Sequence, residues 1–161
     1  MSPASSGEKI LVLRTCYSLR YKPVPPLLLY DGVCGLCNRF VQFILRRDRH
    51  AIFRFASLQS ALAARILSRH GVDPTHLDTV LVVLNHERPD EQLLSRSDAA
   101  LFVLRQLSDP WPAISSLLHL APKFLRNAAY NLIARHRYRL FDRSEICMLP
   151  RDADHSRFLD L

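Results

Sequence analysis

Glycine is scarce in this 161-residue chain, which has only four: Gly7, Gly32, Gly35 and Gly71. Nucleotide-binding turns such as G-x-G-x-x-G and the phosphate-binding P-loop need several closely spaced glycines. Neither motif is present, so an internally bound nucleotide or flavin has no support in the sequence. Two of the four glycines flank one cysteine, in the run Asp31-Gly32-Val33-Cys34-Gly35-Leu36-Cys37.

Cysteines and long apolar runs are also few. The four cysteines are Cys16, Cys34, Cys37 and Cys147, too few for a disulfide scaffold of this length. The apolar run at 10–13 ends at Arg14, too short for a signal peptide, and no stretch reaches the roughly 18 apolar residues of a membrane span. We therefore expect a cytoplasmic protein, where a close cysteine pair is more often redox-active or metal-binding than a static bridge.

The net charge of +7 comes from 22 Lys and Arg against 15 Asp and Glu. The surplus lies in residues 39–50 and 123–143, which have helical periodicity, whereas residues 71–98 are acidic. No nucleic-acid motif accompanies these basic residues, so the pattern favours solvated helix faces over nucleic-acid binding. Contact of the basic C-terminal helix with an anionic membrane or an acidic partner stays open.

The hydrophobic pattern predicts the order β-α-β-α-β-β-α with additional C-terminal helices. Strands are expected at 27–30, 52–56, 79–84 and 92–95, and helices at 34–47, 60–70, 97–107 and 123–136. This is the order of thioredoxins and glutaredoxins, an α/β class. We expect a flexible lead-in over 1–26 and a single domain with a helical C-terminal extension over 27–161.

The cysteine pair falls at the predicted strand-to-helix turn, which places Cys34 at the helix start and Cys37 one turn later. The unpaired N–H groups and dipole of a helix N-terminus favour a thiolate. The thiolate is the nucleophile in disulfide exchange, and the spacing lets Cys37 resolve the mixed disulfide. Gly32 permits the tight turn and Gly35 leaves space beside the sulfurs. Asp31 either relays the proton of the resolving thiol or caps the turn.

Two other uses of a close cysteine pair are haem attachment and zinc binding. A c-type haem needs histidine after the second cysteine, but the chain has Asn38. A zinc-binding module would need Cys147 and His155 to complete the ligand set with Cys34 and Cys37. No HxxxH or HxH spacing occurs, and we expect no resident metal or cofactor. The expected partners are a protein or small-molecule disulfide and an external thiol reductant.

Several segments resemble the DCC family of thiol-disulfide oxidoreductases, named for the Asp, Cys and Cys of its motif. The similar segments are 29–37, Leu58-Gln59-Ser60, Arg96-Ser97-Asp98-Ala99-Ala100, Tyr130 through Phe141, and Cys147, together covering about residues 27–160. The resemblance implies a thioredoxin-like fold and protein-disulfide reductase activity. Unlike thioredoxins, the chain has no proline directly before the hairpin strand: Asp78 and Thr79 stand there, and Pro74 is several residues earlier. Ser97 and Asp98 are expected to cap the helix that follows.

Overall fold

The computed structural model describes residues 24–73, 80–140 and 152–160. Most of the predicted lead-in over 1–26 lies outside these ranges, as do Cys16, Cys147 and the segment 74–79 before the hairpin. The side chains of residues 137–140, 152 and 153 are also outside the described part.

The predicted order of elements is confirmed. The chain forms β1 (Leu27–Tyr30), α2 (Gly35–Arg47), β2 (Arg54–Ser57), α3 (Ala61–Arg69), β3 (Leu81–Leu84), β4 (Gln92–Ser95), α4 (Arg96–Gln106), α5 (Trp111–His119), α6 (Lys123–Leu140) and a 3₁₀ helix, η2 (Asp152–Arg157). The second strand begins two residues later than the pattern predicted, and α6 is longer than expected.

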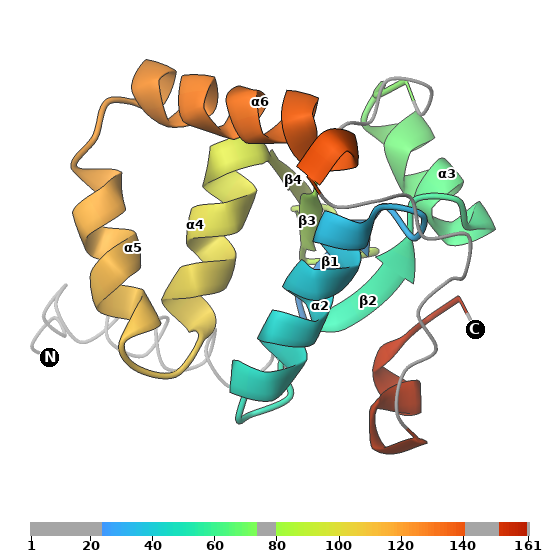
Figure 1. Cartoon of the computed structure of the whole chain (residues 1–161). Coiled ribbons are helices and arrows are strands. Elements are labelled where there is room, and N and C mark those ends of the chain that lie inside the picture. Colours follow the sequence, from blue (N-terminus) through green and yellow to red (C-terminus); the bar gives the residue numbers. More distant parts are fainter. Residues whose placement is uncertain (1–23, 74–79, 141–151, 161) are drawn as a thin grey trace, which may run out of the picture.

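The four strands form one mixed sheet in the order β2-β1-β3-β4. β1 pairs in parallel with β2 and antiparallel with β3, and β3 pairs antiparallel with β4. The central place of β3 fits its apolar character on both faces. This topology agrees with the thioredoxin-like fold expected from the sequence, and α2 crosses in front of the sheet in Figure 1.

Alternation along β1 divides the interior into two cores, because successive side chains of a strand point to opposite faces. Leu28 and Tyr30 join the α2 core, which also holds both cysteines, whereas Leu27 and Leu29 join the α3 core. The other buried members of the α2 core are Val41, Ile44, Phe53, Phe55, Val80, Val82, Ala99, Val103, Leu107 and Phe158. Those of the α3 core are Ala56, Ala63, Ile66, Leu67, Leu81 and Val83.

The predicted boundaries of α3 are confirmed by its contacts. The Ser60 hydroxyl oxygen accepts a hydrogen bond from the Ala63 N–H (3.1 Å) and so caps the N-terminus. Gly71 has φ +63°, the left-handed conformation that commonly ends a helix and that glycine adopts without a Cβ penalty.

The predicted capping of α4 by Ser97 is wrong. The helix begins at Arg96 with Ser95 at the N-cap, so Ser97 already lies within the first turn. Its hydroxyl donates instead to Asn127 Oδ1 on α6 (2.6 Å). Asp98 lies in the first turn as expected, and its carboxylate also forms an ion pair with Lys123 Nζ (2.7 Å). The start of α4 therefore holds α6 in place.

The C-terminal segment packs against the β2 edge of the sheet. Phe158 forms a parallel bridge with Phe55 and stacks on its ring (5.1 Å between centroids). Arg157 forms a buried ion pair with Asp48 and donates to the Phe53 carbonyl oxygen (3.2 Å). These contacts complete the α2 core with residues from the far end of the chain, as Figure 1 shows for η2 beside β2.

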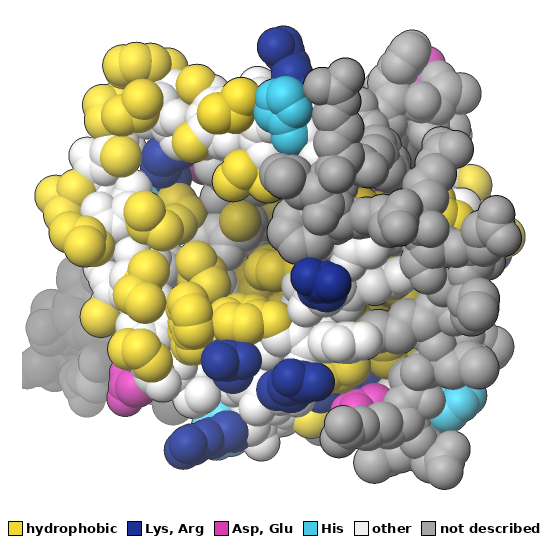
Figure 2. All heavy atoms as spheres, in the orientation of Figure 1, with side chains coloured by type: hydrophobic (Ala, Val, Ile, Leu, Met, Phe, Trp, Pro, Cys, Tyr) yellow, Lys and Arg dark blue, Asp and Glu magenta, His cyan; other side chains and the backbone are white. Residues whose placement is uncertain are grey.

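The helices α5 and α6 leave apolar side chains in solvent. Leu120, Phe124 and Leu132 are 80%, 75% and 60% exposed. Figure 2 shows apolar side chains gathered over this part of the surface, whereas basic side chains lie over the C-terminal half of α2. Trp111, at the start of α5, connects this helix to α2, because its ring packs edge-on against that of Phe43 with 4.7 Å between the ring centroids.

Candidate active site

The two cysteines lie where β1 turns into α2. Cys34 is the N-cap of α2 and Cys37 lies in its first turn. The Cys34 N–H donates to the Asp31 carbonyl oxygen (3.2 Å), and its own carbonyl oxygen accepts from the Asn38 N–H (3.0 Å). Both side chains are thiols, and they are 0% and 4% exposed. The pair is thus held inside the protein at the positive end of a helix.

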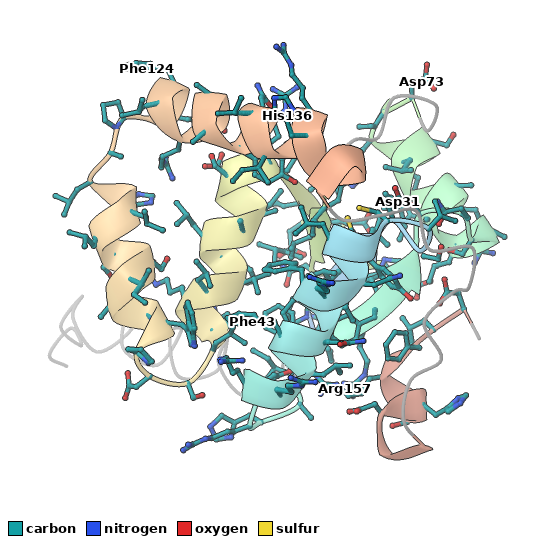
Figure 3. The ribbon with its side chains drawn as sticks, in the orientation of Figure 1. Asp31, Phe43, Asp73, Phe124, His136 and Arg157 are labelled. Atoms are coloured by element: carbon teal, nitrogen blue, oxygen red, sulfur yellow. The ribbon has the colours of Figure 1, made fainter. Side chains whose placement is uncertain are left out.

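The turn that precedes the pair is supported by a hydrogen-bonded network, here called the cradle. It consists of the side chains of Asp31, Asn38, Ser57, Gln59 and Asp160. Gln59, in the loop after β2, donates through Nε2 to Asp31 Oδ1 (3.0 Å) and accepts from the Gly32 N–H through Oε1 (3.2 Å). Asp31 Oδ1 also accepts the N–H of Val33 (3.2 Å). Figure 3 shows Asp31 at the turn into α2. The Asp31 side chain therefore stabilises the turn, as its capping interpretation predicted.

Asn38 closes the cradle from the helix side. Its Nδ2 donates to the Gly32 carbonyl oxygen (3.0 Å), so both backbone polar groups of Gly32 are bonded to side chains. Asn38 Oδ1 is buried and has no hydrogen-bond partner among the described residues. The residue directly after the second cysteine thus fixes the turn from within α2.

The cradle continues to the C-terminal segment. The Ser57 hydroxyl donates to Gln59 Oε1, and the Ser57 N–H donates to the carboxylate of Asp160. Three segments far apart in the sequence, at 31–38, 57–59 and Asp160, are therefore joined by hydrogen bonds beside the turn that bears the cysteines.

The opposite side of the pair is apolar. A cavity of about 150 Å³ lies between α2, α4 and α6, and Cys37 forms part of its wall. The other lining side chains include Phe40 of α2, Ala100 of α4, and Tyr130, Ile133 and Ala134 of α6. Cys37 thus lies between a hydrogen-bonded turn and an apolar cavity.

The structure brings five of the predicted site residues together: Asp31, Gly32, Cys34, Gly35 and Cys37. Ser97 and Asp98 instead contact α6, as described above. Gln59 and Asn38 were not predicted as site residues. Gln59 lies in the Leu58-Gln59-Ser60 segment that carried part of the family resemblance, and that segment was the available signal.

The zinc alternative finds no ligand cluster in the described part of the chain. Within residues 24–73, 80–140 and 152–160, no group of three or more His, Cys, Asp and Glu side chains is placed to hold a metal. His155 is exposed on η2, and Cys147 lies outside the described residues.

A second polar cluster lies at the β3–β4 hairpin. Glu91 accepts hydrogen bonds from Arg69 Nη2 (2.8 Å) and the Glu87 N–H (2.9 Å), and it contacts His70 Nε2 (2.9 Å) and His86 Nδ1 (3.1 Å). Burial raises the pKa of Glu91, but these contacts outweigh it and lower the pKa from 4.5 to about 2. The cluster therefore holds an ionised carboxylate that joins α3 to the hairpin.

Comparison with known proteins agrees with this geometry. Residues 28–143 match the family model described as DCC1-like thiol-disulfide oxidoreductase. The chain is 38% identical over 133 residues to the uncharacterized protein YuxK of Bacillus subtilis (strain 168), covering 83% of this chain and 93% of the relative. It is 36% identical over 124 residues to the DCC family protein At1g52590, chloroplastic, of Arabidopsis thaliana, covering 77% and 69%. No solved structure matches the chain.

The chain therefore belongs to the DCC1-like thiol-disulfide oxidoreductase family. This membership supports a redox function for its thiols. In the described ranges, no helix combines the length and apolar character needed to cross a membrane.

Proposed function

We propose that this protein is a thiol-disulfide oxidoreductase that reduces disulfides with the Cys34–Cys37 pair. The observation that carries the proposal is the position of Cys34 at the N-cap of α2 with Cys37 in the first turn. A helix N-terminus favours the thiolate form of a cysteine, and the thiolate is the attacking species in disulfide exchange. The family to which the chain belongs supports the same chemistry.

The exchange proceeds in two steps. The Cys34 thiolate attacks one sulfur of the substrate disulfide, forms a mixed disulfide and expels the other sulfur as a thiolate that takes up a proton. The Cys37 thiolate then attacks Cys34 Sγ, forms the Cys34–Cys37 disulfide and releases the second substrate thiol. The substrate gains two electrons and two protons, and an external thiol reductant returns the pair to the dithiol form.

The cradle has a positioning role in this scheme. Gln59 and Asn38 fix Gly32 through both of its backbone polar groups, so the turn into α2 holds its shape while the bond on Cys34 changes. Because the Cys34 side chain is 0% exposed, a substrate sulfur reaches it only after a local opening of the surrounding chain.

The proposal is tested with a disulfide-bonded model protein as substrate and dithiothreitol as donor. Cys34→Ser is expected to abolish the reduction, whereas Cys37→Ser is expected to accumulate a mixed disulfide on Cys34, detected by mass spectrometry. Cys16→Ser is the matched control and leaves the rate unchanged. Undiminished activity of Cys34→Ser would overturn the proposal.

A further inference from the structure

The apolar cavity beside Cys37 has no part in the two exchange steps. Its wall combines the first turns of α2 with α4 and α6, so it exists only because α6 lies across the other two helices (Figure 1). Ser97 and Asp98 hold α6 there through Asn127 and Lys123. The cavity is therefore an organised part of the described structure.

Small side chains create the space. Ala100 of α4 and Ala134 of α6 line the cavity where larger residues would fill it. The Tyr130 hydroxyl oxygen accepts the Val80 N–H (3.1 Å), so this polar atom is already engaged with the backbone. Ile133, 54% exposed, lies where the cavity meets solvent. The space is open on one side and apolar on the others.

The size and chemistry of the cavity restrict its occupant. Its volume is about 150 Å³, and a dry apolar cavity of roughly that volume accommodates a benzene ring. Water is a poor occupant because a bound water needs two to four polar partners. Charged groups are excluded by the cost of burying them without a counter-ion. A leucine or phenylalanine side chain meets all of these conditions.

The position of Cys37 in the cavity wall indicates which molecule supplies this side chain. Cys37 is the part of the wall that reacts in the proposed function, so a group in the cavity lies next to the exchanging sulfurs. A substrate whose disulfide is flanked by an apolar residue can place that residue in the cavity while its sulfur reaches the pair. Binding at this point orients the disulfide for attack.

We propose that the cavity is a substrate-binding pocket that takes an apolar side chain adjacent to the disulfide, and that it makes the enzyme selective for such disulfides. This inference rests on the proposed thiol-disulfide exchange. One apolar group in a pocket typically changes kcat/KM by about 10- to 200-fold. Because the pocket is open on one side, we expect a value near the lower end of that range.

The test compares two disulfide-linked peptides that differ at one position, with phenylalanine or serine next to the cysteine. The wild-type protein is expected to reduce the phenylalanine peptide with a kcat/KM about 10-fold higher. Ala134→Leu fills the pocket and should abolish this preference while leaving the serine peptide nearly unaffected. Ala128→Leu makes the same change at an exposed alanine of α6 and should keep the preference.

A binding measurement separates this inference from the exchange reaction. Toluene is titrated into the Cys34→Ser variant, and the methyl resonances of Ala100, Ile133 and Ala134 are followed by NMR. Saturable shifts of these methyls support the pocket, whether or not Ala134→Leu folds and whether or not either peptide is reduced. Equal reduction of both peptides, or no shift of the methyls, overturns the pocket. Reduction of neither peptide overturns the proposed function, and the toluene titration then shows only whether the cavity binds an apolar group.

Discussion

The two faces of the sheet are built differently. The α3 core consists of aliphatic side chains from β1, β2, β3 and α3, and polar groups such as Glu91 lie at its rim. The α2 core is covered by α2 and α4, and the buried polar residues of the described chain lie on these elements, on their flanking turns, on α5 or on the C-terminal segment. These residues are Asp31, Asn38, Asp48, Ser97, Ser115 and Arg157.

The difference separates the residues that stabilise the fold from those that support the exchange reaction. Burial of aliphatic side chains stabilises a fold without requiring any particular polar geometry, and the α3 core does only this. Each buried polar group of the α2 core needs partners, because an unpaired one is costly. The network around the cysteine turn uses those partners to fix the backbone beside Cys34. Changes in the α3 core should therefore alter stability alone, and changes in the cradle should alter the exchange reaction.

The largest expected loss of stability comes from the α3 core. Leu67→Ala removes a fully buried side chain of α3 and is expected to lower the free energy of unfolding by about 3 kcal/mol, measured by urea denaturation. Under conditions where the variant stays folded, its rate of disulfide reduction should remain within about twofold of wild type, since α3 lies on the face away from the cysteines. Leu117→Ala, at a position 69% exposed, is the control and should cost about 0.5 kcal/mol or less. A large loss of kcat in Leu67→Ala would break the division between the two faces.

A smaller loss of stability is expected at the rim of the α3 core. The folded-state pKa of Glu91 lies below its ordinary value, from 4.5 to about 2, so the carboxylate stabilises the fold above pH 4.5 and this contribution is lost as the pH falls toward 2. Since Arg69, one of its partners, is half exposed, we expect Glu91→Gln to cost about 1–2 kcal/mol at pH 6. Urea denaturation from pH 6 to pH 3 should show that the difference in the free energy of unfolding between wild type and Glu91→Gln becomes smaller. A constant difference over that range would contradict the assignment.

The smallest loss of stability is expected in the cradle, where a substitution should instead lower the rate of disulfide reduction. Gln59→Ala removes the hydrogen bonds to Asp31 and Gly32 and should cost only about 1 kcal/mol. Because the turn into α2 loses its support, kcat for disulfide reduction should fall by roughly 3- to 10-fold with little change in KM. Gln106→Ala, at the exposed end of α4, should change neither quantity. Unaltered kcat in Gln59→Ala would show that the cradle is structural only.

Much of the fold was predictable because its elements carry local signals. Continuous apolar runs predicted β1 and β3, and an apolar period of three to four residues predicted α2. The Ser60 cap and the Gly71 end of α3 followed from side-chain and backbone chemistry. The turn bearing Cys34 and Cys37 was equally local. The prediction for Ser97 failed because its hydroxyl bonds to a residue 30 positions away, a contact that no local pattern reports.

The remaining features of the site depend on long-range contacts. Gln59 reaches Asp31 across 28 positions, and Arg157 reaches Asp48 across 109. The pocket arises only where α6 crosses α2 and α4. Spacing along the chain predicts which residues share a helix turn, but it does not predict which distant side chains complete a cradle or leave a cavity.

The central claim is that Cys34 and Cys37 form a reversible two-electron couple. The direct measurement equilibrates the purified chain in buffers of graded thiol and disulfide content, quenches it with an alkylating reagent and identifies the linked peptides by mass spectrometry. We expect one transition in which both cysteines lose their alkylation together and a Cys34–Cys37 linked peptide appears. If both cysteines remain fully alkylated across the whole range, or if Cys34 forms only mixed disulfides with the buffer thiol, the account is contradicted.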